Sequence, residues 1–198
     1  KLQQKHNNGS TKIKRLPATG AVFCYLGIAY SLYLLDHNVE LQKRYIKRLK
    51  DINNFQGAYY ELIVANCLIR SGFNLELEDE DNNQTKHCEF SAVSKKTGKK
   101  YWVEAKMRSV AGILGKTNLN GTTSKDPTCK MSKHLHDAFQ KPASNERLIF
   151  IDVNTNFETD NVVPDWIERA GKKLDMKEKD LLPNQAAYVF VTNMGFHW

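Results

Sequence analysis

A short run near the middle of the chain, Lys99–Arg108, constrains the fold more than any other segment. Its side chains alternate, which predicts a β-strand with Val103 and Ala105 on one face and Glu104 and Lys106 on the other. Such a strand places a carboxylate and an ammonium side by side. A carboxylate binds hard divalent cations, and an ammonium polarises a water molecule or stabilises a developing anion. Taken alone, the pair fits an ordinary ion pair on a half-exposed strand equally well.

Composition and charge narrow the class of protein. The chain has 198 residues, of which 41% are hydrophobic and 26% charged, as expected for a globular domain with a real core. Its net charge of +7 favours a polyanionic partner such as nucleic acid, although the same excess also serves solubility. The cysteines form no Cys-x-x-Cys pair, which disfavours a zinc knuckle and a disulfide scaffold and suits a reducing cytoplasm: Cys24, Cys67, Cys88 and Cys129.

Residues 1–36 differ from the rest of the chain. A polar, basic arm precedes the one strongly apolar run, Ala21–Leu35. This run is shorter than the about 20 residues that a membrane-spanning helix needs, and three tyrosines interrupt it. We expect a helix that is buried or faces a partner, and no membrane span. Because the chain begins with Lys and not with Met, we also expect that further sequence precedes it. We expect residues 1–36 to serve as a linker or as a contact with a second copy or an upstream domain.

Periodicity and turn residues predict the elements of a second unit, residues 37–198. From residue 55 the order is helix, three strands joined as hairpins, helix, strand, helix and strand. This order predicts an α/β fold with a mixed central sheet flanked by helices. The predicted helices cover 39–52, 55–70, 131–141 and 164–179, and the predicted strands cover 73–77, 87–93, 99–108, 148–153 and 187–192.

Two basic segments are candidates for contacts with phosphates. The helix over 39–52 carries five cations away from its apolar stripe, and a solvated face and a phosphate-contacting face fit it equally: Lys43, Arg44, Lys47, Arg48 and Lys50. The segment Ser109–Lys130 is rich in small and polar residues and has no periodicity. A loop of that length is typically functional or disordered.

Two further carboxylates stand out. On its predicted helix, Glu61 has only small or apolar neighbours at helical spacing, so its charge is costly unless it is paired, protonated, bound to metal or turned toward water. In the strand predicted over 87–93, Glu89 shares a face with His87 and Ser91. A hairpin between this strand and the next would bring Glu89 close to Glu104, and two adjacent carboxylates favour a cation between them. A plain surface charge is the alternative for Glu89.

These features together resemble the PD-(D/E)xK nuclease superfamily, which has the restriction-endonuclease-like fold. The helix segment Phe55–Leu62, followed by Gly72 and Phe73, resembles the first core helix of that superfamily. The stretch Cys88–Phe90 resembles its metal-binding region, although Glu89 stands where Asp is usual and no Pro precedes it. The stretch Val103–Lys106 resembles its signature. The resemblance covers about residues 55–153, and by topology extends to 198.

The resemblance implies an αβββαβ core and a Mg²⁺-dependent endonuclease that hydrolyses DNA in preference to RNA, in restriction, repair or anti-phage defence. It implies that Glu89 and Glu104 bind Mg²⁺, for which Mn²⁺ would substitute, that Glu61 completes the site directly or through water, and that Lys106 activates water and stabilises the transition state. The acidic residues 78–81 are an alternative source of the Glu89 ligand. By the same resemblance, residues near the helix over 131–141 assist the site or bind phosphate: Lys130, Lys133 and Gln140. Lys43 and Lys47 are further candidates for phosphate contacts because of the basic face of the helix over 39–52.

Two other functions remain open at this point. A catalytically silent nucleic-acid-binding or assembly module would have the same fold without turnover. An interaction module would use the helix over 21–35 to dimerise, and this is compatible with nuclease activity.

Overall fold

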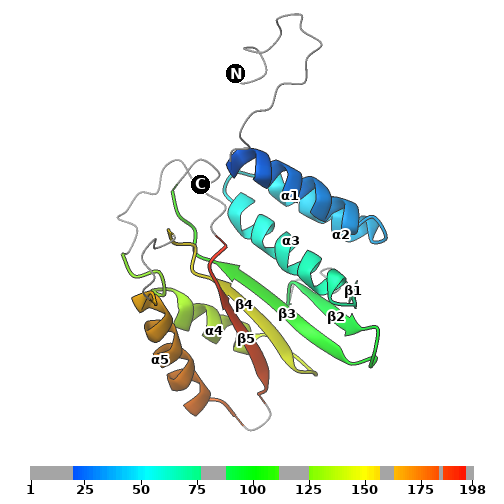
Figure 1. Ribbon diagram of the computed structural model, residues 1–198. Coiled ribbons are helices and arrows are strands. Elements are labelled where there is room, and N and C mark those ends of the chain that lie inside the picture. Colours follow the sequence, from blue (N-terminus) through cyan, green and yellow to red (C-terminus); the bar gives the residue numbers. More distant parts are fainter. Residues whose placement is uncertain (1–19, 77–87, 112–124, 157–162, 183–184, 195–198) are drawn as a thin grey trace, which may run out of the picture.

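The computed structural model describes residues 20–76, 88–111, 125–156, 163–182 and 185–194. Within these residues the protein is α/β, with five helices and one mixed five-stranded sheet (Figure 1). The helices are α1 (Gly20–Leu34), α2 (Val39–Leu49), α3 (Phe55–Arg70), α4 (Met131–Gln140) and α5 (Asp165–Lys179). The strands are β1 (Phe73–Glu76), β2 (Phe90–Ser94), β3 (Lys100–Met107), β4 (Arg147–Asp152) and β5 (Ala187–Thr192). The α/β class predicted from the sequence is confirmed, and so is the order of elements from α3 to β5.

The sheet has the strand order β1-β2-β3-β4-β5 and changes character at β3. The pairs β1–β2 and β2–β3 are antiparallel, whereas β3–β4 and β4–β5 are parallel. A tight turn joins β2 to β3, and Gly98 in that turn has a φ of 69°, a conformation that favours glycine. The parallel pairs need crossovers, which α4 and α5 provide.

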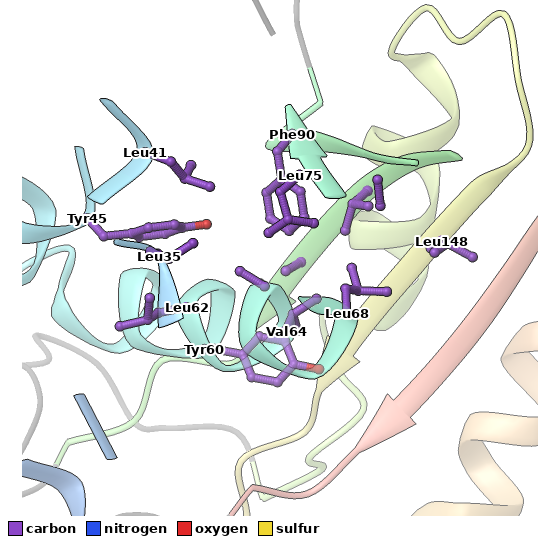
Figure 2. Packing of buried hydrophobic residues seen from close by; sticks show 14 of the residues in the cluster. Leu35, Leu41, Tyr45, Tyr60, Leu62, Val64, Leu68, Leu75, Phe90 and Leu148 are labelled. Atoms are coloured by element: carbon purple, nitrogen blue, oxygen red, sulfur yellow. The ribbon is translucent and has the colours of Figure 1, made fainter. Parts of the chain in front are cut away.

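Helices cover both faces of the sheet. Helices α1, α2 and α3 supply apolar side chains to one core, together with Phe90, Val103 and Ala105 of the sheet (Figure 2). Helices α4 and α5 form a second core with Ile149 and Ile151. Because successive strand residues point to opposite faces, Glu104 and Lys106 lie on the α4 side, in register with Ile149 and Ile151. The alternation predicted from the sequence therefore matches the two cores.

The ends of two helices position the site. Helix α3 ends at Arg70, and Gly72 follows in a left-handed conformation with a φ of 86°, which is typical of a glycine just after a helix. Helix α4 ends at Gln140, and the next residue, Lys141, has extended backbone angles of −73° and 137°. Lys141 precedes Pro142, and the proline ring disfavours helical angles at the residue before it.

The structure corrects some predicted boundaries. The strand predicted over 87–93 begins only at Phe90, so Glu89 precedes β2 and does not lie within it. The helix predicted over 39–52 ends at Leu49. Residues 78–81, His87 and the central part of the loop 109–130 lie outside the described residues.

Helix α1 packs on its own chain along one side. Cys24 and Leu35 are buried, and Ser31 accepts a hydrogen bond from Asn66 of α3. A Cβ at Gly27 would lie 2.9 Å from the hydroxyl of Tyr59, so the two helices are close at this point. In the part of the chain that the structure describes, no helix has both the length and the apolarity to cross a membrane. The division of the chain at residue 36 stays a prediction.

Candidate active site

The site lies where β3 extends beyond β2. The β2–β3 register runs from Val93↔Lys100 to Phe90↔Val103, whereas β4 pairs with β3 as far as Met107. In the described register, the half of β3 that carries Glu104 and Lys106 is thus paired with β4 alone. A hydrogen bond from the Glu89 amide to the Val103 carbonyl, 3.1 Å long, holds Glu89 beside this half-open segment.

Lys106 joins two carboxylates. Its Nζ lies 2.7 Å from Oε1 of Glu89 and 2.7 Å from Oε1 of Glu104. The carboxylates are deeper than the ammonium, because the side chains of Glu104 and Glu89 are 2% and 12% exposed and that of Lys106 is 28% exposed. The strand alternation and the hairpin therefore bring together the residues that the sequence singled out, with one positive charge between two negative ones.

A second ammonium reaches Glu104 from the end of α4. The Nζ of Lys141 donates to both carboxylate oxygens of Glu104, at 2.7 and 2.6 Å. The extended conformation before Pro142 turns this residue away from the helix axis. Two cations compensate the charge of a carboxylate that would otherwise be very costly to bury.

The carboxylate of Glu61 is paired by the neighbouring helix. Both guanidinium nitrogens of Arg48 donate to it, and the Arg48 Nη2 to Glu61 Oε1 distance is 2.7 Å. This bidentate geometry is the strongest that a carboxylate forms with a side chain. Arg48 Nη1 also lies 3.8 Å from Oε2 of Glu89, and Arg44 Nη2 lies 3.9 Å from the same oxygen. Of the states considered for Glu61 from sequence alone, the structure shows the paired one.

The cluster comprises three carboxylates and four cations, and it passes around the sheet edge from the α2–α3 side to the α4 side. We call it the charged cluster: Arg44, Arg48, Glu61, Glu89, Glu104, Lys106 and Lys141. Five elements or their ends supply its members, so it depends on the tertiary fold.

Burial and charge act in opposite directions on the groups of this cluster. Burial raises the pKa of Glu61 to about 7, and the nearby charge of Glu89 adds to this, while Arg48 partly offsets it. Burial would also raise the pKa of Glu89, but Lys106, Lys141 and Arg48 together outweigh burial and lower that pKa below its usual value. For Lys106, burial would lower the pKa, but Glu89 and Glu104 together raise it above its ordinary value. Lys106 is therefore an ammonium at neutral pH.

The donor set suits a hard divalent cation, with a limit on which residues take part. Glu89 and Glu104 offer oxygens 2.7 Å from one shared positive centre, and carboxylate oxygens are the ligands that Mg²⁺ and Mn²⁺ prefer. No group of three or more His, Cys, Asp or Glu side chains with metal-binding proximity occurs among the described residues. Arg48 binds both oxygens of Glu61, and Lys141 binds both oxygens of Glu104, so a cation held by Glu89 and Glu104 would have to displace a lysine ammonium.

Other residues predicted to bind nucleic acid lie outside this cluster. Lys130, Lys133 and Gln140 are exposed at or along α4, and Lys43 and Lys47 are exposed on α2, where Lys43 pairs with Glu40. They remain available for phosphate contacts, which stay a prediction.

Sequence reasoning did not assign Arg48 and Lys141 to the site, although each carries a signal. Arg48 lies seven residues after the buried Leu41, at a spacing that returns to the same side of a helix, whereas Lys43 and Lys47 do not. For Lys141 the signal is Pro142, which follows it and predicts that the helix ends before Lys141.

One histidine of α4 faces the same region. Burial lowers the pKa of His134 to about 4, and the positive charge of Lys106 contributes to this. The Nε2 atom of His134 is buried, and no described residue forms a hydrogen bond with it. His134 is therefore a neutral imidazole at neutral pH.

Comparisons with protein-family models, with curated proteins and with solved structures found no match to this chain.

Proposed function

We propose that this protein is a metal-dependent endonuclease that hydrolyses phosphodiester bonds in DNA, with a core of the restriction-endonuclease-like type. The observation that carries the proposal is the position of Lys106 between Glu89 and Glu104, at 2.7 Å from each. Phosphodiester hydrolysis by a metal-dependent nuclease needs a cation, a water molecule and the phosphate at one point. Two carboxylates can bind the cation, and the ammonium beside them can contact the water and a phosphate oxygen.

The order and pairing of the elements also support this proposal. The carboxylates come from the end of a hairpin and from a strand that continues into a parallel pair, next to a helix that carries Glu61. The net charge of +7 favours a polyanionic substrate.

The residues of the charged cluster take distinct parts in this proposal. Glu89 and Glu104 hold Mg²⁺, which would neutralise charge on the phosphoryl group and make bound water more acidic. Lys106, with its raised pKa, acts as a hydrogen-bond donor that orients the attacking water and stabilises negative charge on phosphate oxygens. Arg48 fixes Glu61 and adds positive charge beside Glu89.

Cleavage of labelled duplex DNA by the purified chain tests this function. We expect products with Mg²⁺ or Mn²⁺, little turnover with Ca²⁺, and none in excess EDTA. RNA of the same sequence, run in parallel, tests the preference for DNA. Undiminished cleavage in EDTA would reject the metal-dependent site, and a lack of cleavage of every duplex and single strand under all metal conditions would reject the enzyme.

One observation favours the alternative of a catalytically silent module. Each of the three carboxylates already has a cation from the chain itself, so the charged cluster is compensated without any bound ion. In that case DNA binding would be measurable and steeply salt-dependent. Binding would not change when Mg²⁺ is replaced by EDTA, and no product would form.

A further inference from the structure

Helix α1 carries large apolar side chains that the described residues of its own chain do not cover. Phe23 is 65% exposed, Tyr25 72%, Leu26 55% and Tyr33 70%, and Tyr30 is 49% exposed. Figure 1 shows α1 at the outside of the molecule, with α3 between it and the sheet. Single exposed apolar residues are common, but a contiguous group on one helix typically marks an interaction surface.

The spacing of these residues describes a helix-packing stripe. Phe23, Leu26, Tyr30 and Tyr33 follow one another at intervals of three, four and three, which is the pattern of a helix that packs along another helix. At 100° per residue, this stripe is on nearly the opposite side of α1 from Cys24 and Leu35, which are buried in the protein's own core. Helix α1 thus has two packing sides, and the described residues of the chain cover only one of them. We call the other side the α1 stripe: Phe23, Leu26, Tyr30 and Tyr33.

We propose that the α1 stripe is the contact with a second copy of this chain, formed by two α1 helices related by a two-fold axis. From the exposed fractions of its members and the size of aromatic side chains, the stripe offers on the order of 500 Å² per copy. Two copies would bury roughly 1,000 Å² together, which reaches the area that a specific protein interface should clear.

The chemistry of α1 favours a copy of itself over other partners. The helix has no charged residue, so two of these helices meet without mutual repulsion even though the chain has a net charge of +7. A helix that lies on a lipid surface typically has a basic polar face opposite its apolar face, but the opposite face of α1 is covered by α3. An acidic or basic peptide would find no charge on α1 to pair with.

The α1 stripe and the charged cluster share no residue, so the dimer and the proposed nuclease activity are tested independently. The experiment is sedimentation equilibrium of the full chain from about 1 to about 100 µM, where interfaces of modest size dissociate. We expect a monomer–dimer equilibrium. Leu26→Glu should weaken it by at least about tenfold, because it places a charge in the centre of an apolar contact.

Met176→Glu is the matched control. Met176 of α5 is 57% exposed, against 55% for Leu26, and the substitution changes the net charge equally. It should leave the dimer unchanged. Tyr33→Ser serves as a second variant that removes apolar area without adding charge, and circular dichroism verifies that each variant is folded.

Three results would overturn the proposal. The first is a wild-type chain that stays monomeric over the whole range. The second is a dimer that the folded Leu26→Glu and Tyr33→Ser variants keep with undiminished affinity. The third is a monomer that floats with vesicles of phosphatidylcholine and phosphatidylglycerol, since this would assign the α1 stripe to a lipid surface.

Discussion

Glu104 and Asp152 are buried carboxylates on neighbouring strands, with residue exposures of 2% and 0%, but they have different partners. Asp152 accepts hydrogen bonds from the backbone amides of Asn154 and Met194, at 2.9 and 2.7 Å, and from the hydroxyl of Thr192 at 2.8 Å. Glu104 contacts the ammonium groups of Lys106 and Lys141.

The difference separates a carboxylate bound by the backbone from one bound by side chains that can move. Backbone donors leave a carboxylate only when the chain itself rearranges, so Asp152 is fixed. A lysine side chain moves by rotation about its own bonds, and Lys106 is partly open to solvent. The charge of Glu104 is thus compensated by groups that can be exchanged for another cation, and we expect function at Glu104 and stability at Asp152.

Lys106→Ala should have the largest effect on activity. In the proposed mechanism it removes the donor that would stabilise the transition state, so cleavage should fall by about 10³-fold with DNA binding almost unchanged. Cleavage rates and DNA affinity of the purified variant give the answer. Lys179→Ala, at an exposed position of α5, is the control and should cleave normally. A Lys106→Ala enzyme with the wild-type rate would remove Lys106 from the mechanism.

The paired substitutions Glu104→Gln and Asp152→Asn test the comparison directly. Glu104→Gln should lower cleavage by about 10²-fold and weaken Mg²⁺ binding, because it removes a charged ligand. Asp152→Asn replaces an acceptor oxygen with a donor group and should lower the free energy of unfolding by about 2 kcal/mol, with the cleavage rate per folded molecule kept. Rates, Mg²⁺ titration and denaturant melts measure these effects. The reverse assignment of effects would show that Glu104 is the structural group.

Lys141→Gln should sharpen the role of the second ammonium. Because Lys141 lies within 2.7 Å of both oxygens of Glu104, its loss removes a cation that competes with Mg²⁺. We expect Mg²⁺ affinity to rise by roughly three- to tenfold, a modest change because solvent weakens such interactions. Isothermal titration with Mg²⁺ is the measurement, and Lys179→Gln, on the exposed surface of α5, provides the control. A fall in affinity would mean that Lys141 orders the ligand and does not compete for it.

Comparing the pH dependence of stability between the wild type and Glu61→Gln tests the pKa of Glu61. We expect this effect to be the smallest of those predicted. Burial raises its pKa to about 7 in the folded protein, so the native state keeps a proton that the unfolded chain has lost. The contribution of Glu61 to stability is full below about pH 4 and is lost as the pH rises toward 7. In Glu61→Gln this decline should be absent. Denaturant melts of both proteins from about pH 4 to pH 7 measure the difference, and identical pH profiles would show that Arg48 keeps Glu61 ionised throughout.

The sequence predicted the fold better than the details of the site. The alternation in β3, the glycines at 72 and 98 and the apolar run of β4 are local signals, so they located elements whose order the structure confirms. The predicted start of β2 was wrong because the pairing of β2 with β3 begins only at Phe90. Strand pairing depends on the tertiary structure and cannot be read from one segment.

The sequence singled out the three carboxylates and Lys106 of the charged cluster. It did not single out Arg48 and Lys141 as their partners. A strand fixes the relation between Glu104 and Lys106 within three residues, so spacing alone is sufficient. Arg48 pairs with Glu61 only because α2 packs on α3, and Lys141 reaches Glu104 only because of a turn after α4. Neither contact follows from the periodicity of one element.

The change from antiparallel to parallel pairing at β3 also separates local from distant contacts in the charged cluster. The α2–α3 pair joins residues close in sequence, with Arg48 and Glu61 only 13 positions apart. The Lys141–Glu104 contact spans 37 positions and needs α4 to cross back over the sheet. The complete cluster therefore requires the parallel half of the sheet to be folded.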